Sequence, residues 1–118
     1  MIVDYTKVKQ VFLICGRTDM RRGIDGLASI ILDQYELDVY SDAIFLFCGG
    51  RLDRFKALYW EGDGFLLLYK RFENGKLKWP RKKSEVRELD EQQIRWLLEG
   101  LSIDQKGKIN PATPGSFS

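Results

Sequence analysis

The sequence predicts an α+β fold in which an antiparallel β-meander of four to five strands packs against two helices. Two observations lead to this class: short apolar runs are separated by glycine-containing turns, and two other segments have the apolar spacing of helices. The predicted element order is β-α-β-β-β-β-α. Short turns between consecutive strands favour antiparallel pairing, and both helices can cover one face of the sheet. The pattern does not define the partner of the first strand.

The first half of the chain is predicted to form a strand, a helix and a central strand. The run VFLIC, residues 11–15, is rich in β-branched and aromatic residues and ends at a glycine. Thr18 or Asp19 would then cap a helix. Residues 43–48, AIFLFC, are apolar on both alternating faces, which is typical of a central strand. The apolar face of the helix is formed by Met20, Ile24, Leu27, Ile31 and Tyr35.

Turn signals divide the second half into further strands. Residues 54–60 alternate in polarity, EGDG at 61–64 is typical of a turn, and residues 65–71 form the next strand. The Asn74-Gly75 pair predicts a two-residue hairpin that leads into a last strand at 76–79.

A second helix is predicted at residues 89–101. Asp90 followed by Gln93 resembles a capping box, and Gly100 is suited to the position after the helix. We expect one domain over residues 1–103, followed by a disordered tail at 104–118 that has few large apolar groups.

Composition indicates a folded protein outside the membrane. No segment approaches the roughly 18 apolar residues of a membrane helix, and the N-terminus lacks the pattern of a secretory signal. Cys15 and Cys48 each end an apolar run, so we expect buried thiols rather than a disulfide. A cytoplasmic location is consistent with this cysteine usage.

The absence of histidine narrows the possible chemistry. With no histidine and two distant cysteines, a structural zinc site and a Ser-His or Cys-His nucleophile are excluded. We expect no cofactor. A magnesium nuclease could use Asp19, Asp25, Asp53 or Asp63. However, a glycine turn explains Asp63 and an ion pair with Arg54 explains Asp53, so a non-catalytic protein is favoured.

The positive charge is concentrated in the middle of the chain. The net charge is only +2, but residues 51–87 contain eleven basic and five acidic side chains. Such a block favours a polyanionic partner. We predict a basic sheet face bordered by the loop Arg81-Lys82-Lys83, although an ordinary solvated face has the same pattern. The residues predicted to share this face are Arg54, Lys56, Trp60, Lys70, Lys76 and Lys78.

The stretch CGRTDMRRGIDGL, residues 15–27, is poorly suited to begin a helix. Arg21 and Arg22 oppose the helix dipole, and Gly23 and Gly26 lower helix propensity. The phosphate-loop and dinucleotide patterns both fail here. Either the backbone is closely approached, or the arginines bind an anion; a simple Arg21–Asp25 ion pair is the alternative.

Several blocks of the sequence resemble TnpB, the small accessory protein of the insertion-sequence-66 family. They are TDMRRGIDGL, DRFKALYW, EGDGF, YKR and WP, in the family's order between Val11 and Ile103. Two departures are slight: Tyr59 stands where the family often has a tryptophan, and RKK follows Pro80. The resemblance implies a protein that assists transposition beside a separate, larger transposase, with no catalytic residues to carry over.

Two functions therefore compete. The first is DNA binding, at the element ends or the target, with the transposase as a second partner; no membrane partner is expected and the oligomeric state is not predicted. The alternative is a module that docks on the transposase without DNA, through the apolar runs AIFLFC and FLLLY. The predicted nucleic-acid-binding residues are Arg17, Arg21, Arg22, Arg51, Arg54, Lys56, Trp60, Lys70, Arg71, Lys76, Lys78, Arg81, Lys82 and Lys83.

Overall fold

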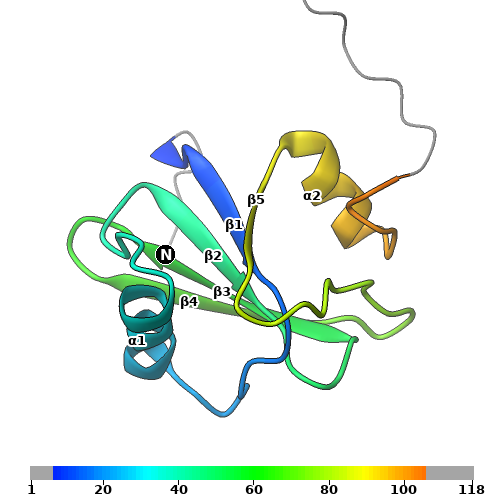
Figure 1. Ribbon diagram of the computed structural model, residues 1–118, viewed down its shortest axis with the longest axis horizontal. Coiled ribbons are helices and arrows are strands. Elements are labelled where there is room, and N and C mark those ends of the chain that lie inside the picture. Colours follow the sequence, from blue (N-terminus) through cyan, green and yellow to red (C-terminus); the bar gives the residue numbers. More distant parts are fainter. Residues whose placement is uncertain (1–6, 106–118) are drawn as a thin grey trace, which may run out of the picture.

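The computed structural model describes residues 7–105 and has the predicted α+β class and element order (Figure 1). The elements are β1 (Gln10–Ile14), α1 (Ile24–Gln34), β2 (Ala43–Phe47), β3 (Arg54–Trp60), β4 (Phe65–Arg71), β5 (Val86–Leu89) and α2 (Glu91–Leu98).

The strands form one sheet in the order β4-β3-β2-β1-β5. β2 is its central strand, as its apolar pattern predicts. Neighbouring strands are antiparallel except β1 and β2, which are parallel and are connected through α1. The first strand, whose partner the sequence left undefined, thus pairs with β2 on one side and with β5 on the other.

The predicted strand at 76–79 is wrong, and the last strand is β5 instead. Leu77 and Trp79 are buried, so the polarity alternates as in a strand, but the backbone joins no ladder. The Leu77 N–H donates to the Leu52 carbonyl at 2.7 Å, and Trp79 Nε1 donates to the Ile14 carbonyl at 2.9 Å. The segment after β4 therefore crosses beside the sheet and returns to its far edge, without the predicted hairpin.

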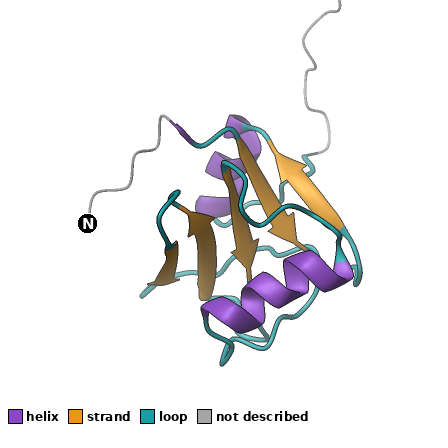
Figure 2. Cartoon of the chain, turned by 90° about the vertical axis from the view of Figure 1, so that its left-hand side faces the viewer, coloured by secondary structure: helices purple, strands orange, loops and turns teal. Residues whose placement is uncertain are grey.

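The two helices lie on opposite faces of the sheet, which corrects the prediction that both cover one face (Figures 1 and 2). Leu27 and Ile31 of α1 pack with Phe45 and Leu58 in one cluster. Leu97 of α2 packs in the second cluster, which also contains residues of β1, β2 and β3. Because the central strand is apolar on both sides, each face of the sheet needs its own cover.

The first helix begins five residues after the predicted cap. Its N-cap is Gly23, with no side-chain cap, so the prediction of Thr18 or Asp19 is wrong. Asp19 closes a turn instead: its carboxylate accepts the Arg21 N–H at 3.0 Å, and its carbonyl accepts the Arg22 N–H at 3.1 Å. The five side chains of the predicted apolar face do pack in one cluster, but only Ile24, Leu27 and Ile31 lie on the helix, since Met20 precedes it and Tyr35 is its C-cap.

The second helix is shorter than predicted, because Leu89 belongs to β5. Its capping box is confirmed: Asp90 accepts the Gln93 N–H at 2.8 Å, and Gln93 Oε1 accepts the Asp90 N–H at 3.0 Å. Gly100 follows the helix with a φ of +79°, as its predicted position requires. Of the predicted tail, residues 106–118 lie outside the described residues.

Both cysteines are free and buried, as predicted. Burial raises the pKa of the Cys15 and Cys48 thiols above their ordinary value. Within residues 7–105, neither helix has the length and apolar character needed to cross a bilayer.

Candidate nucleic-acid interface

The sheet topology gathers three loops at the carboxyl ends of β1 and β2. The loops after β1 and β2 begin there because these two strands are parallel and end at the same edge of the sheet. The segment between β4 and β5 reaches the same end because β4 ends beside the start of β3, and β5 begins beside the end of β1. We call residues 15–23, 48–54 and 70–85 the basic end, which lies toward the bottom and right of Figure 1. It carries twelve lysines and arginines against four carboxylates.

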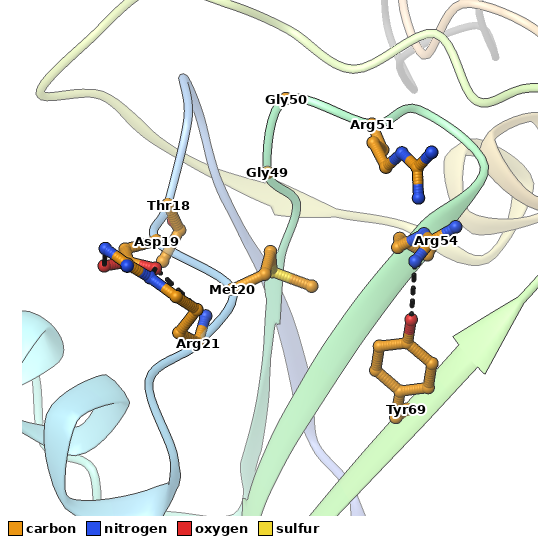
Figure 3. A pocket seen from close by; sticks show the side chains of 9 residues that line it. All are labelled: Thr18, Asp19, Met20, Arg21, Gly49, Gly50, Arg51, Arg54 and Tyr69. Carbon is orange, nitrogen blue, oxygen red and sulfur yellow. Dashed lines mark hydrogen bonds and ion pairs between the residues drawn. The ribbon is translucent and has the colours of Figure 1, made fainter.

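Three of the hollows at the basic end are lined by its arginines and lysines together with the loops after β1 and β2. The Tyr69 hollow, about 390 Å³, is lined by residues 18–21, 49–51, Arg54 and Tyr69 (Figure 3). The Arg17 hollow, about 290 Å³, brings Arg17, Arg22 and Lys83 together between the loop after β1 and the segment before β5. The Lys76 hollow, about 370 Å³, lies between residues 50–53 and Lys76.

The loop after β1 is held tightly against the sheet. The Thr18 N–H donates to the Cys48 carbonyl at 2.9 Å. Lys56 Nζ donates to the Met20 carbonyl at 2.8 Å and to the Arg22 carbonyl at 3.0 Å. A Cβ atom at Gly49 would lie 2.6 Å from Met20 Cγ, so this position has no room for a side chain. The close approach is therefore at Gly49 and not at the glycines for which it was expected, because a Cβ at Gly23 would meet nothing within 4 Å and one at Gly26 would meet only the Arg22 side chain.

Arg54 and Asp53 form a partly buried ion pair beside the same loop. Arg54 Nε lies 2.8 Å from Asp53 Oδ1, as the sequence predicted for this pair. The hydrogen bonds from Arg54 lower the pKa of Asp53 and, in turn, raise the pKa of Arg54. The second contact of Arg54 is a hydrogen bond from Nη1 to the Tyr69 hydroxyl at 3.2 Å, so the pair also fixes the tyrosine.

Arg21 pairs with Asp19 rather than with Asp25, which corrects the alternative drawn from helix spacing. Its Nη2 lies 3.0 Å from Asp19 Oδ2. These hydrogen bonds lower the pKa of the Asp19 carboxyl to about 2. Because Gly23 starts the helix, Arg21 precedes it, and the one-turn spacing to Asp25 does not exist.

The segment before β5 is anchored to the turn after β1. The Gly16 N–H donates to the Pro80 carbonyl at 2.8 Å, and Arg81 Nη1 lies 3.4 Å from the Gly16 carbonyl. Gly16 has a φ of +82°, and Lys83 Cα would lie 3.5 Å from a Cβ at this position. The loop Arg81-Lys82-Lys83 is thereby placed beside Arg17.

The basic sheet face forms only in part. The β3–β4 register pairs Arg54 with Arg71 and Lys56 with Tyr69, whereas Lys70 is paired with Phe55 and lies on the other face. The placement of Lys70 with Arg54 and Lys56 is therefore wrong. Lys76 and Lys78 also leave the sheet, because their segment is not a strand.

Trp60 lies at the opposite end of the sheet from the other predicted residues. It is six residues along β3 from Arg54, which corresponds to about 20 Å in an extended strand. There it contacts two other aromatic rings, with centroid distances of 5.0 Å to Tyr40 and 4.9 Å to Phe65. Trp60 therefore cannot share a patch with the cations of the basic end.

The predicted cations differ in how their charge is used. Lys56 donates hydrogen bonds to the Met20 and Arg22 carbonyls. Four other predicted cations each pair with a carboxylate: Arg21, Arg54, Arg71 and Lys82. Lys70 Nζ lies 5.2 Å from the centre of the Phe72 ring. Within residues 7–105, no carboxylate is within ion-pair distance of Arg17, Arg22, Arg51, Lys76, Lys78, Arg81 or Lys83.

The residues that sequence reasoning missed here are Tyr69, Met20 and Gly49. Tyr69 stands in an apolar strand and lacks a positive charge, so its place beside Arg54 follows only from the strand register. Met20 belongs to the predicted helix face, but Figure 3 shows its side chain also reaching toward Arg54 and Tyr69. For Gly49, the sequence signal was the Gly49-Gly50 pair directly after the apolar run 43–48, which is typical of a turn or of a close approach of another segment.

The carboxylates of the basic end do not form a metal site. Asp19 and Asp53 each pair with an arginine. In the part of the chain that the structure describes, no three histidine, cysteine, aspartate or glutamate side chains are grouped in a way that could hold a metal ion.

Asp63 lies away from the basic end, in a turn closed by a hydrogen bond of 2.8 Å from the Glu61 N–H to the Gly64 carbonyl, as its glycine neighbours predict.

Comparison with known proteins gives one family and two curated relatives. The family model for the IS66 Orf2 like protein matches residues 9–108. The uncharacterized protein y4jC of Sinorhizobium fredii is 34% identical over 83 residues, covering 70% of this chain and 71% of the relative. The uncharacterized protein y4hO of the same strain is 28% identical over 92 residues, covering 78% and 80%. No solved structure matches significantly.

Proposed function

The chain belongs to the IS66 Orf2-like family and is thus an accessory protein of IS66 transposition; from this premise, we propose that it binds DNA through the basic end. The observation that carries the proposal is the gathering of twelve cations at one end of the sheet against four carboxylates. Neutralising DNA phosphates with such cations releases counterions, which is the main source of sequence-independent affinity.

The availability of these charges supports the proposal. Arg17, Arg51 and Lys83 are exposed and line hollows, and no described carboxylate pairs with them. The Arg71–Glu73 and Lys82–Glu85 pairs are exposed, so exchanging the carboxylate for a phosphate costs little. The N-terminus of α1 also points its dipole toward this end.

A salt series with terminal-repeat DNA tests the proposal. Wild-type protein is expected to bind in a mobility-shift assay, with affinity that falls as salt rises. Replacing Arg51, Lys76, Lys78 and Lys83 together by glutamine is expected to reduce the slope of log K against log salt by up to about 3.6. Arg54 and Lys56 are left unchanged because they hold Tyr69 and the loop after β1.

The matched control neutralises Lys7 and Lys9, which precede β1 at the other end of the sheet. This double variant is expected to retain the wild-type slope. Absence of any DNA binding by the wild-type protein would contradict the proposed function. An equal slope in wild type and the four-site variant would show that the surface is elsewhere.

Docking on the transposase is the second candidate. The run AIFLFC, predicted as part of its surface, is almost wholly buried in the central strand and cannot serve it, but a separate surface favours docking. Tyr40, Trp60 and Phe65 form an aromatic cluster at the end opposite the basic end, and Tyr40 is 56% exposed. The loops 35–42 and 61–64 around this cluster carry five carboxylates and no cation. Exposed aromatic rings beside carboxylates suit a basic protein segment.

Capture of the transposase by immobilised protein tests this second candidate. The double variant Glu61→Lys and Asp63→Lys is expected to lower capture, whereas the four-site glutamine variant is expected to capture normally. Undiminished capture by the turn variant would contradict docking at this end. Repeating the mobility shift with and without transposase separates the two functions.

A further inference from the structure

We propose that the Tyr69 hollow binds a single unpaired nucleotide of DNA, with the base against the Tyr69 ring and its phosphate near Arg51. This inference rests on the proposed function, because it names the form of DNA that the basic end takes. It adds a preference that charge alone does not give, since cations on a surface bind duplex and single strands alike.

The dimensions of the hollow suit this ligand. Its volume of about 390 Å³ lies at the small end of the range of ligand sites, and it is bounded on one side by the loop after β1 and on the other by β3 and β4. A base inside a duplex has both ring faces stacked and cannot enter such a concave site. Only a nucleotide that has left the stack can reach Tyr69.

Tyr69 is exposed and yet held in place. The residue is 52% exposed. Its hydroxyl accepts a hydrogen bond from Arg54 at 3.2 Å, and Lys56 Nζ lies 6.0 Å from the ring centre. Arg54 is itself fixed by Asp53. An exposed ring that is already immobilised loses little entropy on stacking, which favours its use as a platform for a base.

The remaining walls supply apolar contact and charge. Figure 3 shows the Met20 side chain reaching into the hollow from the loop side, across from Arg54 and Tyr69. Arg51 is exposed on the rim, and within residues 7–105 no carboxylate pairs with it. The arrangement thus combines a ring, a thioether and an uncommitted guanidinium, which match the base and the phosphate of one nucleotide.

Fluorescence anisotropy with two labelled duplexes tests the inference. The duplexes share one sequence, and one of them carries a single unpaired nucleotide in its centre. Wild-type protein is expected to bind the bulged duplex at least about fivefold more tightly, since base–aromatic stacking contributes that much or more. Tyr69→Leu is expected to abolish the difference while leaving affinity for the fully paired duplex in place. Tyr69→Phe, which keeps the ring but loses the Arg54 hydrogen bond, is expected to retain most of the difference.

The control variant is Tyr40→Leu, which removes a similarly exposed tyrosine at the opposite end. It is expected to keep the full preference. Equal affinity of the wild type for both duplexes would overturn the inference and leave the proposed function standing. A preference that survives Tyr69→Leu, or that is lost in Tyr40→Leu, would overturn the assignment to this hollow. No binding to either duplex would overturn the proposed function itself.

Discussion

The two ends of the sheet differ in charge and in construction. At the basic end, the loops and the adjoining strand ends carry twelve cations; at the opposite end, the loops 35–42 and 61–64 carry five carboxylates. α1 runs from the first end to the second, so its dipole has the same sense as the separation of side-chain charge. Although the net charge is only +2, positive and negative side chains are separated to opposite ends of the molecule. The positions of the charges therefore predict partners better than their sum does.

The ends also differ in what holds them. The opposite end is closed by a four-residue turn between β3 and β4 and by contacts among partly exposed rings. The basic end depends on side chains that reach backbone carbonyls, such as Trp79 to Ile14 and Lys56 to Met20. We infer that the loops of the basic end are held by side-chain hydrogen bonds to backbone carbonyls, whereas at the opposite end the loop 35–42 is anchored by the buried Val39 and the turn 61–64 by its own backbone hydrogen bond.

The largest expected effect comes from removing Trp79. The side chain is 5% exposed and donates a hydrogen bond across the core, so Trp79→Ala is expected to lower the free energy of unfolding by about 3–5 kcal/mol. Trp60→Ala, at the opposite end, is expected to cost clearly less because Trp60 is only half-buried. Urea denaturation of both variants measures this. Equal losses would show that the two ends are held in the same way.

A smaller effect is expected from adding one methyl group at a glycine. Gly49→Ala places Cβ 2.6 Å from Met20 Cγ and 3.2 Å from the Thr18 carbonyl, so a loss of about 1–3 kcal/mol is expected. Gly64→Ala, in the turn at the opposite end, meets nothing within 4 Å and is expected to be neutral or slightly stabilising. Thermal unfolding distinguishes the two. A tolerated alanine at Gly49 would mean that the loop after β1 is not tightly packed.

The smallest expected effect is a pH dependence at Asp19. Its pKa of about 2 lies below the ordinary 3.8, so the folded state favours the ionised carboxyl. The stabilisation from the Arg21 pair is therefore complete above about pH 4 and is lost as the pH falls toward 2. Because the pair is exposed, only a slight change is expected. NMR titration of the Asp19 carboxyl measures the pKa, and Arg21→Gln is expected to return it toward 3.8.

The sequence predicted the parts of the fold whose signals are local. The strands at 54–60 and 65–71, the apolar positions Ile24, Leu27 and Ile31 of α1 and the Asp90–Gln93 capping box each depend on signals within a few residues, and all are present. The segment 76–79 shows the limit of this reasoning. It alternates like a strand because Leu77 and Trp79 are buried, but those side chains dock through single hydrogen bonds to distant carbonyls, which no local pattern reveals.

The nucleic-acid-binding residues remain a prediction, but the structure changes the surface on which most of them lie. The basic residues of the middle third do meet the arginines of the stretch 17–22, but at one end of the sheet rather than on one face. Lys70 was misplaced because assigning faces across two strands requires the register, and a shift of one residue reverses every side chain. Trp60 shares a strand face with Arg54, but strand length separates them.

The place of β1 between β2 and β5 has a consequence for how the chain is made. One edge of β1 has no partner strand until β5, about 75 positions later in the chain, has been made. While a ribosome is still extending the polypeptide, the N–H and C=O groups along that edge have no ladder partner, and premature termination before Val86 would leave them open to other chains. Pairing of β5 with β1 covers this edge, and the edge of the sheet on that side is then the short strand β5.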